Sequence, residues 1–276
     1  MQPAGTTGAD STGTEPIIPE IKGECPEFKP GTSTVSLMGI RATVIAGEKK
    51  QGTGSLLFYY YGTGKTFDVN NLPRAIKDDI VADGGIIFAP SSAKNTGGDC
   101  SGTGTFGVDD FEVSDQVVAC AVKNYGIDPK RIYATGCSAG GLHAGCMGIR
   151  RSNYLAAVAP NSGGITTGYG KLQNPLHAPS VITMNGGASD NVIVNFGDTS
   201  EAYGNYILKY GGFAVNCIHS STHCGAPAGL YTSAWQFLKD HPFGTKPSPY
   251  EGGLPSGFDS TCKVFEMTSR VPLGGF

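Results

Sequence analysis

The five residues Gly136-Cys137-Ser138-Ala139-Gly140 place a serine between two glycines, the spacing of a nucleophile elbow. The motif follows the strand-like run RIYATG (residues 131–136) and precedes a run with helical spacing. A sharp strand-to-helix turn strains the backbone of the central residue, and flanking glycines give it the room it needs. We therefore predict Ser138 as a nucleophile at the end of a strand.

A serine hydroxyl attacks only when a base takes its proton, and a histidine base needs a carboxylate to orient it. Behind a nucleophile elbow the acid comes next along the chain, followed by the histidine. We predict Asp190, which directly follows the strand-like run SVITMNG, as the acid; its rival Asp198 has the position of a helix N-cap. The loop CIHSSTHCGAP holds two candidate bases, and we favour His223 over His219 because it lies deeper in the loop.

The run LLFYYYGTGKT (residues 56–66) ends like a phosphate-binding loop. Such a loop needs a glycine five positions before Gly64, and Tyr59 stands there instead. We favour a different role, in which a buried strand delivers a turn for the oxyanion of an acyl-transfer reaction. The predicted donors are the backbone N–H group of Ala139, directly after the nucleophile, and one from the turn at residues 61–64. Tyr61 and Phe106 are predicted to line an apolar substrate groove, although aromatic residues in strands more often belong to the core.

Four thiol and imidazole groups lie within eight residues, at Cys217, His219, His223 and Cys224. Zinc is an alternative here, but adjacent ligands fit one tetrahedral ion poorly and no C-x-x-C pair is near. We expect no metal and no cofactor, and favour a Cys217–Cys224 disulfide. Cys100–Cys137 and Cys120–Cys146 are further candidate pairs among the eight cysteines.

These residues must be positioned by a suitable scaffold, and strand-like and helix-like runs alternate along the chain. Strands are expected at residues 35–45, 55–61, 84–90, 131–136, 156–162, 180–186 and 213–218, and helices at 72–82, 110–125, 138–152, 200–210 and 230–240. This alternation predicts an α/β fold with a mostly parallel central sheet flanked by helices. We expect a flexible leader over residues 1–24, a single domain over 25–245 and a Pro/Gly-rich tail over 246–276 packed on it.

The chain of 276 residues has a net charge of -3, so it carries no basic field for nucleic acid. The even number of cysteines and the Gly/Thr-rich stretch 2–15 suggest an exported protein, secreted, periplasmic or on the cell surface. We expect a monomer whose removed N-terminal lipoprotein signal could provide a membrane tether.

Several segments together resemble extracellular poly(3-hydroxybutyrate) depolymerases and the related feruloyl and acetylxylan esterases. They are IDPKRIYATGCSAGG, APNSGG, the Asp190 loop, THCGAP, AWQFLKDHPFG and PSPYEGGLP, within residues 25–265. Within this group the sequence looks closest to the hydrolases of oxidised poly(vinyl alcohol), which cleave β-diketones. The resemblance implies an α/β-hydrolase fold, with Ser138, Asp190 and His223 as the triad and Thr63 and Ala139 as oxyanion donors.

The sequence departs from this group at two places. Tyr61-Gly62 stands where relatives usually have His-Gly, and the acid loop lacks the frequent His-Gly-Thr-x-Asp pattern. The expected function is hydrolysis of a polymeric or small ester, or of a β-diketone, because the same triad serves both reactions. An alternative of another class is an exported binding module without catalysis.

Overall fold

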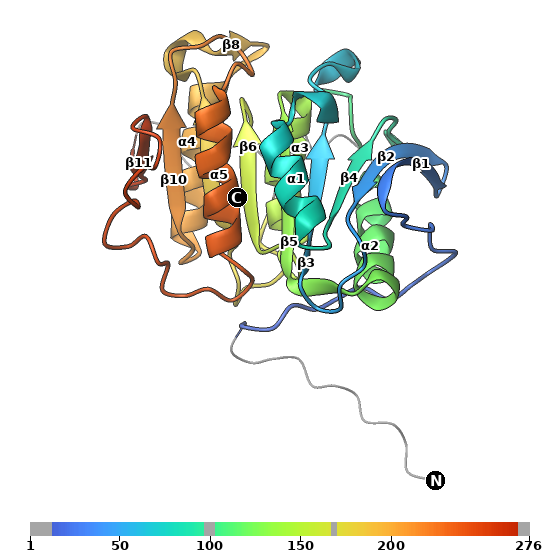
Figure 1. Cartoon of the computed structure of the whole chain (residues 1–276). Coiled ribbons are helices and arrows are strands. Elements are labelled where there is room, and N and C mark those ends of the chain that lie inside the picture. The colour runs from blue at the N-terminus through green and yellow to red at the C-terminus, as the bar shows by residue number, and fades with distance from the viewer. Residues whose placement is uncertain (1–12, 97–102, 167–169, 270–276) are drawn as a thin grey trace.

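The computed structural model describes residues 13–96, 103–166 and 170–269. Within these residues one sheet of nine strands has the order β1-β2-β4-β3-β5-β6-β7-β10-β11 (Figure 1). Pairing is parallel from β4 through β10 and antiparallel at both edges. The strands are β1 (Gly31–Leu37), β2 (Ile40–Ala46), β3 (Gly54–Tyr60), β4 (Ile86–Pro90), β5 (Ile127–Cys137), β6 (Ala157–Asn161), β7 (Ser180–Asn185), β10 (Ala214–Ile218) and β11 (Cys262–Val264). The hairpin of β8 (Asn191–Val192) and β9 (Val194–Asn195) lies apart from this sheet.

Helices cover both faces of the sheet, as Figure 1 shows. The helices α1 (Arg74–Ala82) and α5 (Ala228–Asp240) pack on one face, and α2 (Asp110–Cys120), α3 (Ala139–Arg150) and α4 (Phe196–Lys209) on the other. The central strands are buried on both faces, which explains their nearly unbroken apolar runs. A short π-helix (Ala121–Tyr125) continues α2.

The run at residues 35–45, predicted as one strand, is a hairpin of β1 and β2. The two strands pair in register around Met38 and Gly39, whose φ angles are 50° and 84°. Two central residues with positive φ are the mark of a type I′ turn, which normally contains Asn-Gly or Asp-Gly. Here Met38 occupies the first position and continues the apolar run, so the sequence pattern does not indicate a turn.

The two ends of the described chain are attached to the domain. Within the predicted leader, the N–H of Ile17 donates to the carbonyl of Asn153 at 2.7 Å, and the N–H of Lys22 donates to Gln116 Oε1 at 2.9 Å. Within the predicted tail, β11 adds an antiparallel edge strand to β10. Residues 13–24 therefore lie against the domain, and the tail completes the sheet.

The disulfides described are Cys25–Cys120, Cys137–Cys224 and Cys217–Cys262. The expectation that the cysteines form disulfides is confirmed. All three predicted pairs, Cys217–Cys224, Cys100–Cys137 and Cys120–Cys146, are wrong, because one partner or both are bonded elsewhere. Each observed pair joins elements far apart in sequence, whereas the predictions relied largely on local proximity.

Candidate active site

Ser138 lies at the turn between β5 and α3, at the carboxyl edge of the sheet. Its backbone has φ 57° and ψ -123°, a conformation that non-glycine residues rarely adopt. Every other residue from Ile132 to Ile149 is buried, whereas Ser138 is partly exposed. The fold therefore holds one strained serine at the surface of an otherwise buried strand and helix, as a nucleophile elbow requires.

The glycines of the elbow bring two backbone segments unusually close. A Cβ atom at Gly140 would lie 2.2 Å from the carbonyl oxygen of Tyr60, and one at Gly136 would lie 2.6 Å from the same atom. Any side chain there would push the end of β3 away from the start of α3. The two glycines thus set the spacing between the elbow and the turn that follows β3.

That turn, residues 62–66, is closed by an antiparallel bridge between Gly62 and Thr66. The N–H of Gly62 donates to the carbonyl of Thr66 at 2.7 Å, so it is engaged within the turn. Thr63 follows on the exposed side. Ala139 is the first residue of α3, where the N–H groups lack acceptors inside the helix and the helix dipole favours negative charge. Thr63 thus lies in the turn that follows β3, and Ala139 directly follows Ser138.

Asp190 and His223 form a close pair. His223 Nδ1 lies 2.7 Å from Asp190 Oδ1, and the Asp190 side chain is fully buried. Burial raises the pKa of Asp190, but hydrogen bonds from His223, from the Ser162 hydroxyl and from the Gly186 N–H outweigh it and hold the pKa below its ordinary value. The other ring nitrogen, His223 Nε2, is covered and has no hydrogen-bond partner among the described residues. The carboxylate thus fixes one side of the imidazole and leaves the opposite nitrogen available to accept a proton.

Two aromatic rings flank His223, and neither was predicted from the sequence. Phe196 is buried, with its ring centroid 4.7 Å from that of His223. Phe196 follows the β8–β9 hairpin, and its N–H donates to the carbonyl of Asp190 at 2.8 Å. The segment that begins at Asp190 therefore also positions the Phe196 ring. Phe67 is half-buried, and its ring lies edge-on to His223 at 6.3 Å.

The Cys137–Cys224 disulfide joins the residue before Ser138 to the residue after His223, with their Cα atoms 5.8 Å apart. A ring nitrogen of His223 lies within 4.8 Å of both sulfur atoms. Zinc binds cysteine as the thiolate, and both cysteines of the predicted cluster, Cys217 and Cys224, are consumed in disulfides. The cysteine cluster therefore braces the site covalently and does not fit a zinc ion.

The rival residues do not take part in the close pair of Asp190 and His223. His219 is buried near Asp190, but it is His223 that bonds to the carboxylate. Asp198 lies in the first turn of α4, and the N-cap is Asn195, whose side chain accepts from the Asp198 N–H. The remaining histidines are buried in other parts of the core: His143 in α3, His177 before β7 and His241 after α5.

The predicted substrate residues have different surroundings. Tyr61 lines a cavity of about 180 Å³ beside the turn, together with Tyr59, Lys65 and Asp68. Burial and the charge of Asp110 raise the pKa of Tyr61 to about 12, so its phenol stays protonated at neutral pH. Phe106, by contrast, is only 1% exposed, and its ring packs against those of Tyr61, Tyr60 and His143. It belongs to the core and not to a groove.

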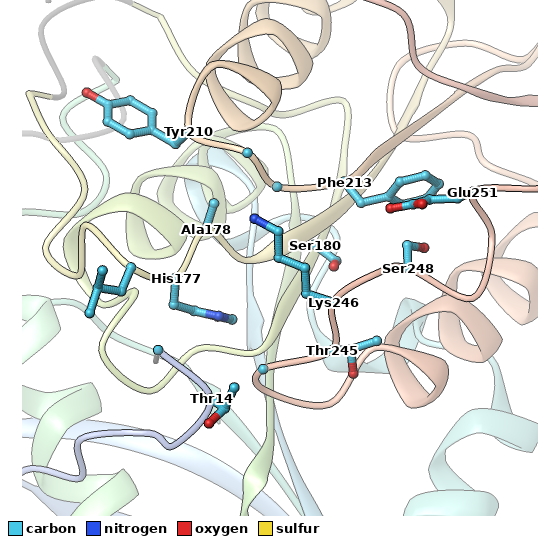
Figure 2. A pocket seen from close by; sticks show the side chains of 15 residues that line it. Thr14, His177, Ala178, Ser180, Tyr210, Phe213, Thr245, Lys246, Ser248 and Glu251 are labelled. Atoms are coloured by element: carbon cyan, nitrogen blue, oxygen red, sulfur yellow. The ribbon is translucent and has the colours of Figure 1, made fainter. Parts of the chain in front are cut away.

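A second cavity, of about 80 Å³, lies at the opposite edge of the sheet (Figure 2). Its lining includes Ser180 at the start of β7, Phe213 just before β10, and the side chains of Thr14 and Lys246. These are the amino ends of the strands, whereas Ser138, Asp190 and His223 follow carboxyl ends. The second cavity is therefore separate from Ser138, Asp190 and His223.

Comparison with known proteins supports the fold. No family model and no curated protein sequence matches the chain. Among solved structures, native pOPH, an oxidised poly(vinyl alcohol) hydrolase, is 19% identical with a TM-score of 0.62, covering 89% of this chain and 98% of its own. Native sOPH is 16% identical with a TM-score of 0.59, covering 92% and 99%. A propionate-bound esterase from the planctomycete Thermogutta terrifontis is 16% identical with a TM-score of 0.55, covering 76% and 93%. The predicted fold class is confirmed: the chain has the α/β-hydrolase fold.

Proposed function

We propose that this chain is a serine hydrolase that cleaves carboxylic esters through an acyl-enzyme. The observation that carries the proposal is the hydrogen-bonded pair of buried Asp190 and partly buried His223, together with the disulfide that links the residue after His223 to the residue before the strained Ser138. A serine at an elbow, a histidine with one free ring nitrogen and a carboxylate on the other nitrogen are the parts that acyl transfer needs. Their chain order matches that of the fold.

The reaction proceeds in two halves. His223 Nε2 takes the proton of Ser138 as Oγ attacks the ester carbonyl, and the N–H groups of Thr63 and Ala139 stabilise the resulting oxyanion. The C–O bond breaks, the alcohol leaves with the proton from His223, and Ser138 remains acylated. A water molecule, deprotonated by His223, then attacks the acyl-enzyme; the bond between the acyl carbon and Ser138 Oγ breaks, Oγ takes the proton back from His223, and the acid is released. Asp190 holds the imidazole and stabilises its cationic form in both halves.

A second candidate is hydrolysis of a β-diketone, favoured by the fold likeness to pOPH and sOPH. Here Ser138 attacks one ketone, the C–C bond breaks, and the leaving group departs as an enolate that takes the proton from His223. The triad and the oxyanion donors serve both reactions. The purified protein offered polyhydroxybutyrate, methyl ferulate and a soluble β-diketone in parallel will rank the two.

The substitution Ser138→Ala tests the proposed function. We expect it to abolish hydrolysis of p-nitrophenyl acetate and covalent labelling by a fluorophosphonate probe, because no other residue at the elbow can form the acyl-enzyme. Circular dichroism and a thermal melt should show an intact fold. Ser92→Ala is the control, since the Ser92 hydroxyl accepts the Arg41 N–H at 2.8 Å in an exposed hydrogen bond away from Ser138.

Two results would contradict the proposal. Wild-type protein that neither labels nor hydrolyses any of the substrates would favour a binding module. Activity lost to a chelator, with stoichiometric zinc, would favour metal catalysis.

The disulfides also lead us to propose that the protein functions in an oxidising compartment outside the cytoplasm. No helix in the described ranges is long and apolar enough to span a membrane.

A further inference from the structure

The dipeptide Asn161–Ser162, directly at the carboxyl end of β6, contacts the segments that carry all three triad residues. The carbonyl of Asn161 accepts the N–H of Ser138 at 3.2 Å. The Asn161 side-chain amide donates to the carbonyl of Cys224 at 3.1 Å, next to His223, and its Nδ2 lies 2.7 Å from Tyr231 Oη. One residue therefore connects the nucleophile to the loop of the base.

The Ser162 hydroxyl makes a second connection. It donates to Asp190 Oδ2 at 2.7 Å and accepts the N–H of Cys224 at 2.8 Å. The oxygen it contacts on Asp190 is not the one that holds His223, which is Oδ1. A single hydroxyl thus lies between the acid and the backbone immediately after the base. Its proton is donated to the carboxylate, and one of its two lone pairs accepts the amide N–H.

The conformation of Ser162 shows that the fold holds this hydroxyl in place at a cost. Ser162 is fully buried, with φ 41°, in the left-handed region that disfavours side chains. Its own N–H donates to the carbonyl of Met184 in β7 at 2.7 Å, which anchors the strained residue to the next strand. Glycine would relieve the strain but would remove the hydroxyl. Strained residues of this kind cluster at functional sites.

We propose that Ser162 is a positioning residue of the triad, whose hydroxyl fixes the Asp190 carboxylate and the His223 loop relative to each other. The proposal rests on the serine-hydrolase function stated above. Held at Oδ2 by Ser162 and by the Gly186 N–H at 3.1 Å, the carboxylate cannot rotate away from His223. Because the hydroxyl does not reach the substrate, its loss should slow the chemical step and spare substrate binding.

The test compares Ser162→Ala with Ser162→Gly. Both remove the hydroxyl, but only glycine relieves the strained backbone. We expect both to lower kcat for p-nitrophenyl acetate by roughly 10- to 100-fold, the size expected for one hydrogen bond to a charged group, with KM changed by less than about threefold. The downfield proton signal of the His223–Asp190 hydrogen bond in the NMR spectrum should broaden or vanish in both variants.

Ser152→Ala is the matched control. Ser152 is also fully buried and also accepts a backbone N–H, from Asn174 at 2.7 Å, but it lies outside the site. It should lose stability without losing kcat. Fluorophosphonate labelling of wild-type Ser138 separates the two hypotheses. If wild type does not label, the proposed function fails; if it labels while both Ser162 variants keep full kcat, the positioning role fails. A normal kcat in Ser162→Gly alone would also overturn it, since strain and not the hydroxyl would then explain the alanine variant.

Discussion

At the scale of single residues, the turn beside the elbow contains a strained aromatic side chain. Phe67 has φ 51°, which is rare for a large residue, and it follows Gly64 and Lys65 at 71° and 63°. Its Cδ2 atom lies 3.3 Å from where a Cβ at Gly62 would be, so the ring contacts the turn at residues 62–66 as well as His223. Because the ring is half-buried, part of its surface is open to a bound molecule. We expect it to form a wall of the acyl-binding region.

Phe67→Ala should therefore change chain-length preference. Removing the ring takes away apolar contact worth roughly 1–2 kcal/mol, so kcat/KM for p-nitrophenyl hexanoate should fall about tenfold relative to the acetate. Lys65→Ala, in the same turn and also at positive φ, is the control and should leave that ratio unchanged. An identical hexanoate-to-acetate ratio in wild type and Phe67→Ala would rule out the contact.

Residue types and chain order suffice to propose Ser138, Asp190 and His223, because the elbow motif limits where each partner can lie. They do not reveal Phe67 or Ser162. Both have left-handed backbone conformations, which residues of these types rarely adopt. Residue type and spacing therefore do not predict where these two side chains lie.

At the scale of elements, the site depends on how closely α3 approaches the end of β3. Strand and helix positions were largely predictable, since the central runs are apolar and glycine or proline separates them. The β1–β2 hairpin and the edge strand β11 were not predictable. Met38 stands in the first turn position, where Asn or Asp would have indicated a turn, and β11 has three residues and is joined to β10 by the Cys217–Cys262 disulfide, whose cysteines lie 45 residues apart in sequence.

Gly140→Ala tests this close approach. A Cβ at Gly140 meets backbone atoms of Tyr60 and Tyr61 at 2.2–2.6 Å, so the end of β3 must shift and carry Thr63 with it. We expect a loss of about 1–3 kcal/mol in the free energy of unfolding and a fall in kcat of roughly 100-fold, since small displacements of catalytic groups are costly. Denaturant titration and steady-state kinetics measure the two effects.

The matched control is Gly229→Ala. Gly229 is the second residue of α5 as Gly140 is of α3, but a Cβ there would meet only Asp259 Oδ2, at 3.9 Å. This variant should be as stable as wild type or up to about 1 kcal/mol more stable. Equal behaviour of the two glycine variants would refute the spacing argument.

At the scale of the whole molecule, buried histidines make the fold sensitive to acid. Burial lowers the pKa of His143 to about 3 and that of His177 to about 4, and it also lowers the pKa values of His219 and His241. A histidine with a depressed folded pKa stays neutral in the fold while the unfolded chain binds a proton. Its stabilising contribution is complete above about pH 6.5 and declines as the pH falls towards the folded pKa.

His143→Phe tests this dependence. Neither ring nitrogen of His143 has a hydrogen-bond partner in the described residues, and the ring stacks on Phe106 and Phe111 with centroids 4.6 Å away. Wild type should lose up to about 1.4 kcal/mol of unfolding free energy per pH unit for each such histidine between pH 6 and 4.5. The variant should show a shallower slope by about one such contribution, measured by urea titration at several pH values. An unchanged slope would mean that His143 does not contribute.

The disulfide between Cys137 and Cys224 keeps Ser138 and His223 covalently linked even if the main chain between them is cleaved. A single peptide cleavage anywhere from residue 139 to residue 222 leaves Ser138 and His223 on two fragments that are still covalently joined. Asp190 remains on one fragment or the other. A nick within these 84 residues would therefore leave Ser138, Asp190 and His223 on fragments that the disulfide still joins.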